Sequence, residues 1–355
     1  MINPFKFGTI VEGEFFTDRV REVDYIQQFI ESENHLVLIS PRRFGKSSVV
    51  HKALINTSRQ SITLNLQNVT SEADLAAKLL REIYKIHPFE RVKQFVMRFR
   101  IIPSLSTNPV TGMIDLSFQP TENPTILLED VMDLMDGISS PDNRLVVVLD
   151  EFQEIMSLAP NLDKKLRAMM RSQKNINYIL LGSQETMMTD IFEKKKSPFY
   201  HFGQLMRLKA IPRADLENYI SSRLQNCLNS DVEAVTQHIL DFTHCHPYYT
   251  QQLAAQIWQM SMLQTATDDI LETAIQQIIE IHDLDYERLW VNFNKTDKSV
   301  LIKLAKNQPV QDLDRRTSTT YSALKRLQKA GFLVYTTKFE IEDPFFSRWI
   351  FQVIN

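Results

Sequence analysis

The sequence predicts an α/β fold with a parallel sheet, followed by an all-helical region and a C-terminal helix-turn-helix with a wing. Short apolar strands alternate with helical patterns up to residue 205. After Pro212 the strand patterns disappear and helical patterns follow. The chain then closes with a helix–turn–helix and two strand-like segments. Alternating strands and helices favour a parallel sheet covered by helices. We therefore expect three parts, over residues 1–207, 208–293 and 294–355.

Four short runs predict the strands of the sheet. Each run is apolar on both faces and is bounded by turn residues, which is typical of a parallel strand covered by helices on both sides. The runs are HLVLIS (35–40), SITLNL (61–66), RLVVVLD (144–150) and NYILLGS (177–183). Between the second and third, residues 71–86 have the apolar spacing of a helix, and Ser71 to Asp74 form a capping-box variant.

Residues 97–120 interrupt this alternation. Two short alternating stretches flank TNPVTG, which predicts a β-hairpin inserted before a helix at 125–137. After Pro212 the helical patterns cover 212–227, 231–243, 247–264 and 267–293. The last part reads as helix 297–306, turn, helix 317–330, Gly331 and the strand-like FLVYTT and KFEIED, the order of a winged helix-turn-helix.

Composition excludes several classes of protein. The net charge of −3 over 355 residues gives no global basic field for nucleic acid or a membrane surface. Cys227 and Cys245 have no metal-ligand spacing, so free thiols are favoured over a metal site or a disulfide. No stretch reaches the ~18 apolar residues of a membrane span. The N-terminus lacks a basic region followed by an apolar signal core, so we expect a cytoplasmic protein.

The stretch LVLISPRRFGKSSVV predicts a phosphate-binding loop. An apolar strand ends abruptly, a tight turn follows, and Lys46 and Ser47 supply the ammonium for phosphate and the hydroxyl for Mg²⁺. A small residue can replace the usual first glycine, because the closest approach to phosphate is made at the second. The predicted nucleotide contacts are Ser40, Pro41, Arg42, Arg43, Phe44, Gly45, Lys46, Ser47 and Ser48.

Two further strand ends carry polar residues. Asp150 and Glu151 end the apolar strand VVVLD, where one carboxylate can hold Mg²⁺ together with Ser47 and the other can activate the attacking water. An ordinary acidic strand terminus is the alternative. Ser183 ends YILLGS, at a position that can sense the terminal phosphate, with a simple turn as the alternative. Lys46, Asp150, Glu151 and Ser183 are therefore the predicted catalytic residues of a P-loop NTPase.

With these residues in hand, the chain resembles the archaeal-ATPase-like group of STAND proteins, signalling relatives of AAA-type ATPases, in a bacterial form. The resemblance spans most of the chain. It includes an F-x-x-R motif at Phe16 and Arg19, the lid motif in HPYYTQQL, and the motif in FEIEDPFFSRWI that ends the family's winged-helix domain. The matching segments are NPFKFG, FFTDRVREVDYI, SPRRFGKSS, VVVLDEFQEI, LRAMMRSQKNINYILLGSQETMM, HPYYTQQL and FEIEDPFFSRWI.

The resemblance implies that ATP or ADP, with Mg²⁺, binds between the sheet domain and a helical lid. The N-terminal segment with Arg19, and His246 with Pro247, would close over the nucleotide. From its chemistry alone, His246 is equally well interpreted as a packed residue at a helix start. The resemblance also implies a switch with a protein partner and an oligomer that depends on nucleotide.

Three positions depart from the family pattern. Ser40 replaces the first loop glycine, Cys245 stands where the lid motif often has glycine, and Phe202 stands where members often carry arginine. A missing arginine argues against fast hydrolysis, because such a residue contributes on the order of 10³–10⁵ in rate. Arg167 and Arg171 are candidate substitutes, although a solvated helix face is the favoured reading of both.

The predicted recognition helix, TSTTYSALKRLQKAG, leaves the output of the protein open. The residues that suit DNA are Arg315, Arg316, Lys325, Arg326 and Lys329, whereas nearby acidic residues such as Glu342 favour a packing or partner-docking role. Three hypotheses follow: a slow ATPase switch, an ATP-gated DNA-binding protein, and an interaction protein that holds nucleotide without turnover. The intact Glu151 favours the first, because a purely structural site needs no water-activating carboxylate.

Overall fold

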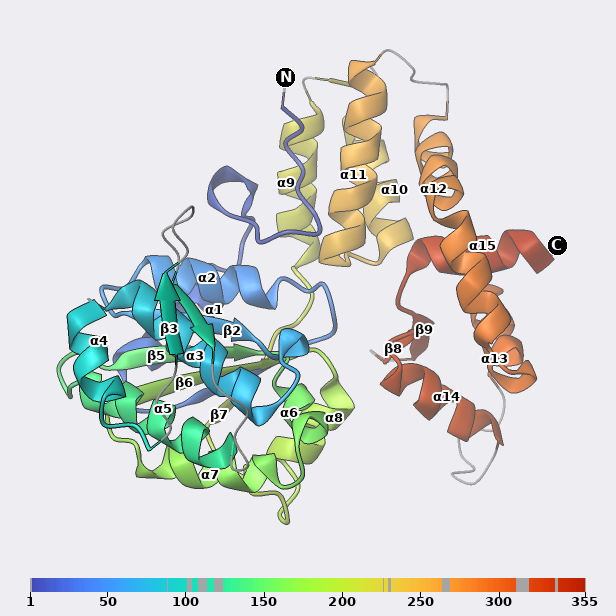
Figure 1. Cartoon of the computed structure of the whole chain (residues 1–355). Helices are drawn as coiled ribbons and strands as arrows, with labels where there is room; N and C mark the ends of the chain where they lie inside the picture. The colour runs from blue at the N-terminus through green and yellow to red at the C-terminus, as the bar shows by residue number, and fades with distance from the viewer. Residues whose placement is uncertain are drawn as a thin grey trace. The chain divides into compact units, whose positions relative to one another are not determined.

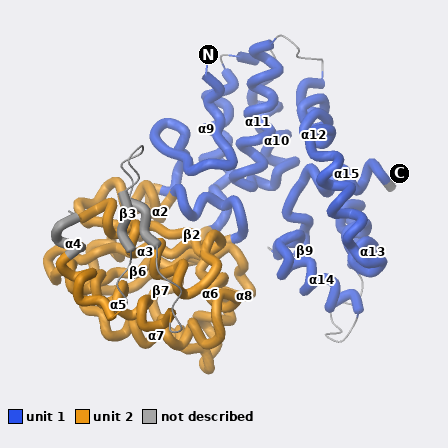
Figure 2. The backbone as a smooth tube through the Cα atoms, viewed as in Figure 1, with its two compact units in different colours: residues 1–19, 41–48, 209–355 blue, residues 20–40, 49–208 orange. Residues whose placement is uncertain are grey.

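A computed structural model of the chain describes residues 2–87, 89–100, 104–107, 114–117, 124–225, 227–228, 231–263, 269–310, 319–335 and 338–354. The chain divides into two compact units, each described here by itself (Figure 2). The first unit contains residues 1–19, 41–48 and 209–355, and the second contains residues 20–40 and 49–208. The predicted phosphate-binding loop thus groups with the C-terminal half of the chain.

The second unit is built on a five-stranded parallel sheet with the strand order β2-β5-β6-β1-β7 (Figure 1). The strands are β1 (Leu36–Ile39), β2 (Ser61–Asn65), β5 (Leu145–Asp150), β6 (Ile176–Gly182) and β7 (Gln204–Arg207). The four predicted strands are confirmed. The sequence did not predict β7, whose residues are half-buried or exposed and form no apolar run.

Helices cover both faces of this sheet, as the apolar strands require. On one face, Val37, Ile39, Val147 and Leu149 belong to a core that also contains residues of α3, α5 and α7. The neighbouring residues of the same strands, such as Leu38, are equally buried on the other face. The helices are α1 (Val20–Glu31), α2 (Lys46–Ile55), α3 (Glu72–Ile86), α4 (Phe89–Val96), α5 (Pro124–Ile138), α6 (Ile155–Leu158), α7 (Leu162–Ser172) and α8 (Glu185–Phe192).

Local signals fix the start of α3. Ser71 is the N-cap, and its hydroxyl accepts from the backbone N–H of Asp74 at 3.1 Å. The Asp74 carboxylate reaches back to the N–H of Thr70 at 2.9 Å, one residue earlier than in a capping box. The predicted cap is therefore confirmed, with a shifted return bond.

The predicted hairpin before α5 is confirmed by its pairing. Strands β3 (Ser104–Thr107) and β4 (Ile114–Ser117) are antiparallel, with Ser104 opposite Ser117. The TNPVTG turn itself extends into residues that lie outside the described part of the chain.

The first unit is mainly helical and has its own core. Its elements are α9 (Arg213–Leu224), α10 (Val232–Thr243), α11 (Pro247–Met262), α12 (Ile270–Asn292), α13 (Lys295–Ala305), α14 (Thr319–Lys329), β8 (Leu333–Tyr335), β9 (Phe339–Ile341) and α15 (Pro344–Ile354). One core cluster runs from Phe5 through Leu253 of α11 and Leu324 of α14 to Ile350 of α15. The sequence analysis did not predict α15 as an element.

The C-terminal segment shows the expected order of helices and strands. Helices α13 and α14 are followed by β8 and β9, which pair antiparallel with Leu333 opposite Ile341. Residues 311–318, which include the expected helix start at Thr317 and the two arginines before it, lie outside the described residues. None of the described helices has the length and apolar composition that crossing a bilayer requires.

Candidate functional site

The strand ends that carry the predicted polar residues meet at one edge of the sheet. Strand β6 lies between β5 and β1, and all three are parallel, so their carboxyl ends share this edge. Ser40, Asp150 and Ser183 follow or end these strands. The parallel topology therefore brings the three predicted positions to the same side of the second unit.

Ser40 continues the strand that precedes the loop. Its side chain is fully buried, and its N–H donates to the carbonyl of Gly182 at 3.3 Å. The loop residues with positive φ are Arg43 (61°) and Gly45 (84°), and Ser40 is not among them. The first loop position therefore needs no glycine here, which explains why serine is accommodated.

The loop closes on Lys46, the first residue of α2. The lysine is 6% exposed, and its ammonium donates to the carbonyl of Pro41 at 3.3 Å, across the turn. Apart from Gly45 and its two chain neighbours, no atom of the described residues lies within 4 Å of the point where a Cβ on Gly45 would stand. The glycine therefore leaves open space beside the N-terminus of α2, where backbone N–H groups and the helix dipole favour an anion.

The remaining loop residues differ in their surroundings. Arg42 is exposed, and Ser47 is half-buried in the first turn of α2. Ser48 is buried, and its hydroxyl accepts the backbone N–H of Val11 at 3.0 Å. The N-terminal segment thus binds directly to the helix that follows the loop.

Arg43 and Phe44 join the loop to the start of α11. The Arg43 guanidinium donates to the hydroxyl of Tyr249 at 3.1 Å and lies 4.4 Å from the ring centre of Tyr248. The Phe44 ring meets the edge of His246 with 4.8 Å between centroids. Within the first unit, the predicted loop and lid residues therefore contact each other.

His246 has two roles at this point. It is the N-cap of α11, and its Nδ1 accepts from the N–H of Tyr248 at 3.2 Å, with Pro247 at the first helical position. It is also 7% exposed and packs on the loop. The turn before it contains His244 and Cys245 with φ of 51° and 56°, so left-handed residues form this turn where the family often has glycine.

Glu342 connects this start of α11 to the C-terminal segment. Its Oε2 accepts from the Tyr249 hydroxyl at 2.7 Å, and its Oε1 lies 3.2 Å from His246 Nε2. Burial, followed by the nearby charges of Asp343 and Glu342, raises the pKa of Tyr249. The hydroxyl therefore stays protonated, accepting from Arg43 while it donates to Glu342. Sequence reasoning missed both Tyr249 and Glu342.

The N-terminal segment adds further contacts to this region. Phe7 packs edge-on against Tyr248 at 5.6 Å, and the Asn3 amide donates to the carbonyl of Ala255 in α11 at 3.1 Å. Arg19 is 2% exposed and has φ of 68°, a left-handed conformation. The segment that resembles the family's N-terminal motif is thus held against α11 at several points.

At the acidic strand end, Glu151 is held in a defined position. Its φ is 54°, and its N–H donates to Asp150 Oδ1 at 2.8 Å. The Ser183 hydroxyl, which is 6% exposed as a residue, donates to Glu151 Oε2 at 2.6 Å. Ser183 therefore lies beside the predicted catalytic carboxylate.

Sequence reasoning missed a third member of this cluster. Gln153 is fully buried, and its amide Nε2 donates to the same Glu151 Oε2 at 2.5 Å. Its carbonyl Oε1 is buried and has no hydrogen-bond partner within the described part of the chain. The signal was the sequence DEFQ, in which a polar residue interrupts the apolar positions after the strand.

Position 202, where proteins of the group that the sequence resembles often carry arginine, is part of the core. Phe202 is 7% exposed and stacks on His35 with 4.5 Å between centroids and 16° between planes. The Arg167 guanidinium lies over the Phe202 ring at 5.0 Å. His35 and Phe202 precede β1 and β7, so Arg167 packs at the amino edge of the sheet, opposite the predicted site.

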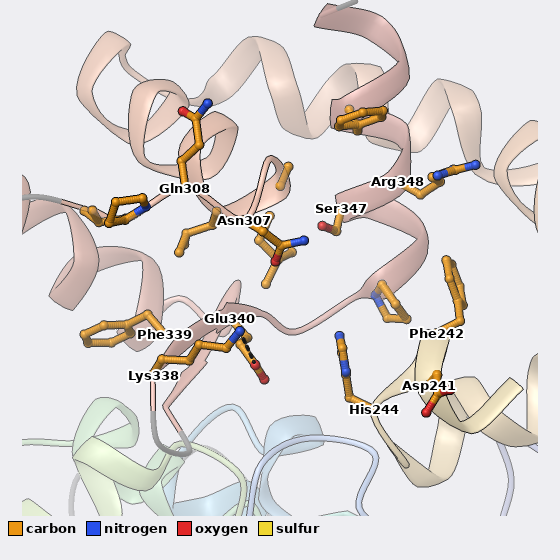
Figure 3. A pocket seen from close by; sticks show the side chains of 17 residues that line it. Asp241, Phe242, His244, Asn307, Gln308, Lys338, Phe339, Glu340, Ser347 and Arg348 are labelled. Carbon is orange, nitrogen blue, oxygen red and sulfur yellow. Dashed lines mark ion pairs between the residues drawn. The ribbon is translucent and has the colours of Figure 1, made fainter. Parts of the chain in front are cut away.

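A separate cavity of about 730 Å³ lies within the first unit, between α10, α13, β9 and α15 (Figure 3). Its labelled side chains are of mixed character, with Phe242, Lys338 and Arg348 among them. None of the predicted nucleotide contacts lines it. Among the described residues, no group of three or more His, Cys, Asp or Glu is arranged to hold a metal.

Comparisons with known proteins address the family and the fold. Residues 30–187 match the family model described as an AAA domain. This part of the chain is therefore similar to AAA domains. A search of curated protein sequences gave no match.

Solved structures of archaeal proteins have a similar fold over the whole chain. A Walker-type ATPase of Pyrococcus abyssi has a TM-score of 0.67 at 15% identity, covering 98% of this chain and 99% of its own. The ORC2 protein of Aeropyrum pernix, in ADPNP–ADP complexes, has a TM-score of 0.56 at 13% identity with 99% coverage of both chains. The ORC1 protein of Aeropyrum pernix, in complex with DNA, has 0.52 at 10% identity, covering 95% and 93%.

Proposed function

We propose that this protein is a slow ATPase switch, in which the bound nucleotide sets the position of the lid and the C-terminal segment. The observation that carries the proposal is the chain of hydrogen bonds from Arg43 through Tyr249 to Glu342. It links the phosphate-binding loop, the first turn of α11 and the residue that follows β9. A change at the loop therefore has a direct route to the C-terminal segment.

The charge of Arg43 makes this link sensitive to nucleotide. Its guanidinium sits in the loop and bonds a neutral hydroxyl, whereas a phosphate offers a charge-assisted, bidentate partner. If Arg43 turns towards phosphate, the Tyr249 hydroxyl loses the donor that helps to orient its bond to Glu342. Nucleotide then shifts the balance between two arrangements by its different affinity for each.

The residue types of the loop, and separately those of the strand ends, are the types that nucleotide and Mg²⁺ require. The open space at Gly45 and the N-terminus of α2 suit phosphate, and Lys46, the first residue of α2, supplies an ammonium to bind it. Ser47 and Asp150 would hold Mg²⁺, which usually takes one or two protein ligands with phosphate oxygens and water. Mg²⁺ supplies neutralisation of phosphate charge, while Glu151 would accept the proton of the attacking water and Ser183 would hold that carboxylate.

The assignment to the STAND group and the winged-helix identity of residues 294–355 belong to this proposal. The order α13, α14, β8, β9 and the F-x-x-R and HPYY motifs support both. A protein partner docked on the C-terminal segment, and an oligomer that depends on nucleotide, are the expected outputs. We expect the protein to act in the cytoplasm.

DNA binding is the second candidate function, supported by the likeness to a structure solved with DNA. One contact counts against it. Arg326 of α14 donates from Nε to Asp297 Oδ2 at 3.1 Å, which pairs the guanidinium within the fold. Duplex binding that weakens steeply with added salt would support this candidate, and a flat response to salt would exclude it.

The proposal is tested by nucleotide binding and by hydrogen exchange. Calorimetry should show ATP and ADP binding to the parent and a loss of at least about tenfold in affinity in Lys46→Ala, because the ammonium that reaches phosphate is removed. The control is Lys52→Ala in the last turn of the same helix. Amide exchange over 339–354 should differ between the ATP and ADP forms. Equal exchange in both forms would contradict the switch.

A further inference from the structure

Two donors converge on a single oxygen of the predicted catalytic carboxylate. Ser183 Oγ and Gln153 Nε2 lie 2.6 and 2.5 Å from Glu151 Oε2. Both hydrogen bonds end on Oε2, so Oε1 is the oxygen left to accept a proton. The left-handed backbone at Glu151 restricts the side chain further.

The Gln153 amide can face the carboxylate in one orientation only. Turned over, its carbonyl Oε1 would oppose the carboxylate oxygen, and both atoms are acceptors. In the orientation present, the buried Oε1 has no hydrogen-bond partner among the residues that the structure describes, and the residue as a whole is fully buried. A buried, unpaired carbonyl reduces stability, so an apolar residue of similar size would suit the core better. This cost indicates a role other than packing.

We propose that Gln153 is a positioning residue that fixes Glu151 as the general base, an inference that rests on the proposed ATPase function. With Oε2 anchored by Gln153 and Ser183, Glu151 presents Oε1 to the attacking water. Oε1 takes one water proton as the water oxygen bonds to the terminal phosphorus and the bond to the ADP oxygen breaks. The proton then passes to the released phosphate. Gln153 itself touches neither the water nor the nucleotide.

The first test removes the donor. In Gln153→Leu the carboxylate loses one anchor, and kcat should fall about 10–100-fold, as for other residues that orient a catalytic ligand. The affinity for Mg·ATP should stay within about twofold, because the loop is untouched. The matched control is Gln60→Leu, which removes an amide donor to the carbonyl of Ile86 at 2.9 Å, beyond the amino end of β2. If Gln153→Leu does not fold, Gln153→Met is the second variant.

The second test places another carboxyl beside Glu151. In Gln153→Glu two carboxyl groups share the site, and one proton is held to a higher pH than either would hold alone. The acid limb of the kcat–pH profile should therefore move up by about one pH unit or more. A purely structural role of Gln153 would not move this limb.

The pH dependence of the stability of Gln153→Glu tests the same contact in the protein without nucleotide. The shared proton raises a folded-state carboxyl pKa above its unfolded value, so Gln153→Glu should lose stability relative to the parent as the pH rises from about 4 to 8. Urea unfolding at each pH measures this loss. A constant difference between variant and parent would overturn the contact between residues 153 and 151.

The outcomes distinguish a failure of the positioning role of Gln153 from a failure of the proposed ATPase function. A parent that binds no nucleotide contradicts the proposed function. A parent that hydrolyses ATP, with Gln153→Leu hydrolysing equally fast, overturns the positioning role alone. In a Glu151→Gln background, adding Gln153→Leu should lower kcat no further, because both changes act through one carboxylate. A further tenfold fall there would also overturn it.

Discussion

The hydroxyl of Tyr249 donates to Glu342 at 2.7 Å while it accepts from Arg43 at 3.1 Å. One buried hydroxyl thereby joins a residue of the phosphate-binding loop to a residue 93 positions further along the chain than itself. Because a hydroxyl can donate and accept at once, it suits a position between a cation and an anion. Phenylalanine would fill the same space and provide neither bond.

Tyr249→Phe should therefore separate the loop from the C-terminal segment. It leaves a largely buried carboxylate oxygen without its donor, and the free energy of unfolding should fall by about 1–3 kcal/mol. Urea unfolding measures this loss, with Tyr248→Phe as the control because the adjacent tyrosine contacts Arg43 through its ring. In the variant, nucleotide should no longer change amide exchange over 339–354. A nucleotide response as large as in the parent would exclude Tyr249 from the route.

The site was predictable where parallel strands end. Apolar runs identify β1, β5 and β6, and because these strands are parallel neighbours, the residues after them meet at one edge. Ser183 beside Glu151 follows from this geometry. Strand β7 has no comparable run, since QLMR is half-buried or exposed, and no local signal separates it from a loop.

Contacts made by folding distant segments together were not predictable. Nothing in HPYY specifies a partner near residue 342, and nothing in FEIEDPFFSRWI, which contains Glu342, specifies a contact with α11. The sequence offers only a weak indication that Gln153 belongs to the site, because a glutamine after a strand is usually exposed. Its burial depends on how the chain packs after Glu151. Phe202 could be identified as a departure, while its stacking on His35 depends on the pairing of β1 with β7.

His35 should make the protein sensitive to acid. Burial, with Arg167 and Arg144 nearby, lowers the pKa of His35 to about 4 from 6.5. The folded chain therefore keeps the imidazole neutral where the unfolded chain protonates it, and stability present above pH 6.5 is lost as the pH falls towards 4. The shift corresponds to at most about 3 kcal/mol.

Urea unfolding between pH 7 and 4 checks this, with His35→Gln as the comparison. The variant should lose less stability than the parent over that window, because glutamine does not titrate. Equal losses in both proteins would assign the acid sensitivity to other groups.

Gly182→Ala should disturb the end of β6. A Cβ there would stand 2.2 Å from the sulfur of Met188, whose side chain is fully buried. Overpacking of this kind costs about 1–3 kcal/mol and would displace the adjacent Ser183. Thermal unfolding measures the loss. Adding Met188→Ala should remove the clash, so the double variant should lose less than the two single losses added together; simple additivity would show that the clash is not the cause.

Glu151→Gln should bind nucleotide and fail to turn it over. The amide keeps the size of the side chain, while it cannot take a proton from water, and removal of a general base lowers rate by about 10²–10⁴. ATP should still raise the unfolding temperature as it does in the parent, because binding to the folded state alone stabilises it. Phosphate release and thermal shift are measured together, with Glu154→Gln as a neighbouring control. Parent-like hydrolysis in Glu151→Gln would transfer the base role to another residue, and a lost thermal shift would show that Glu151 serves binding instead.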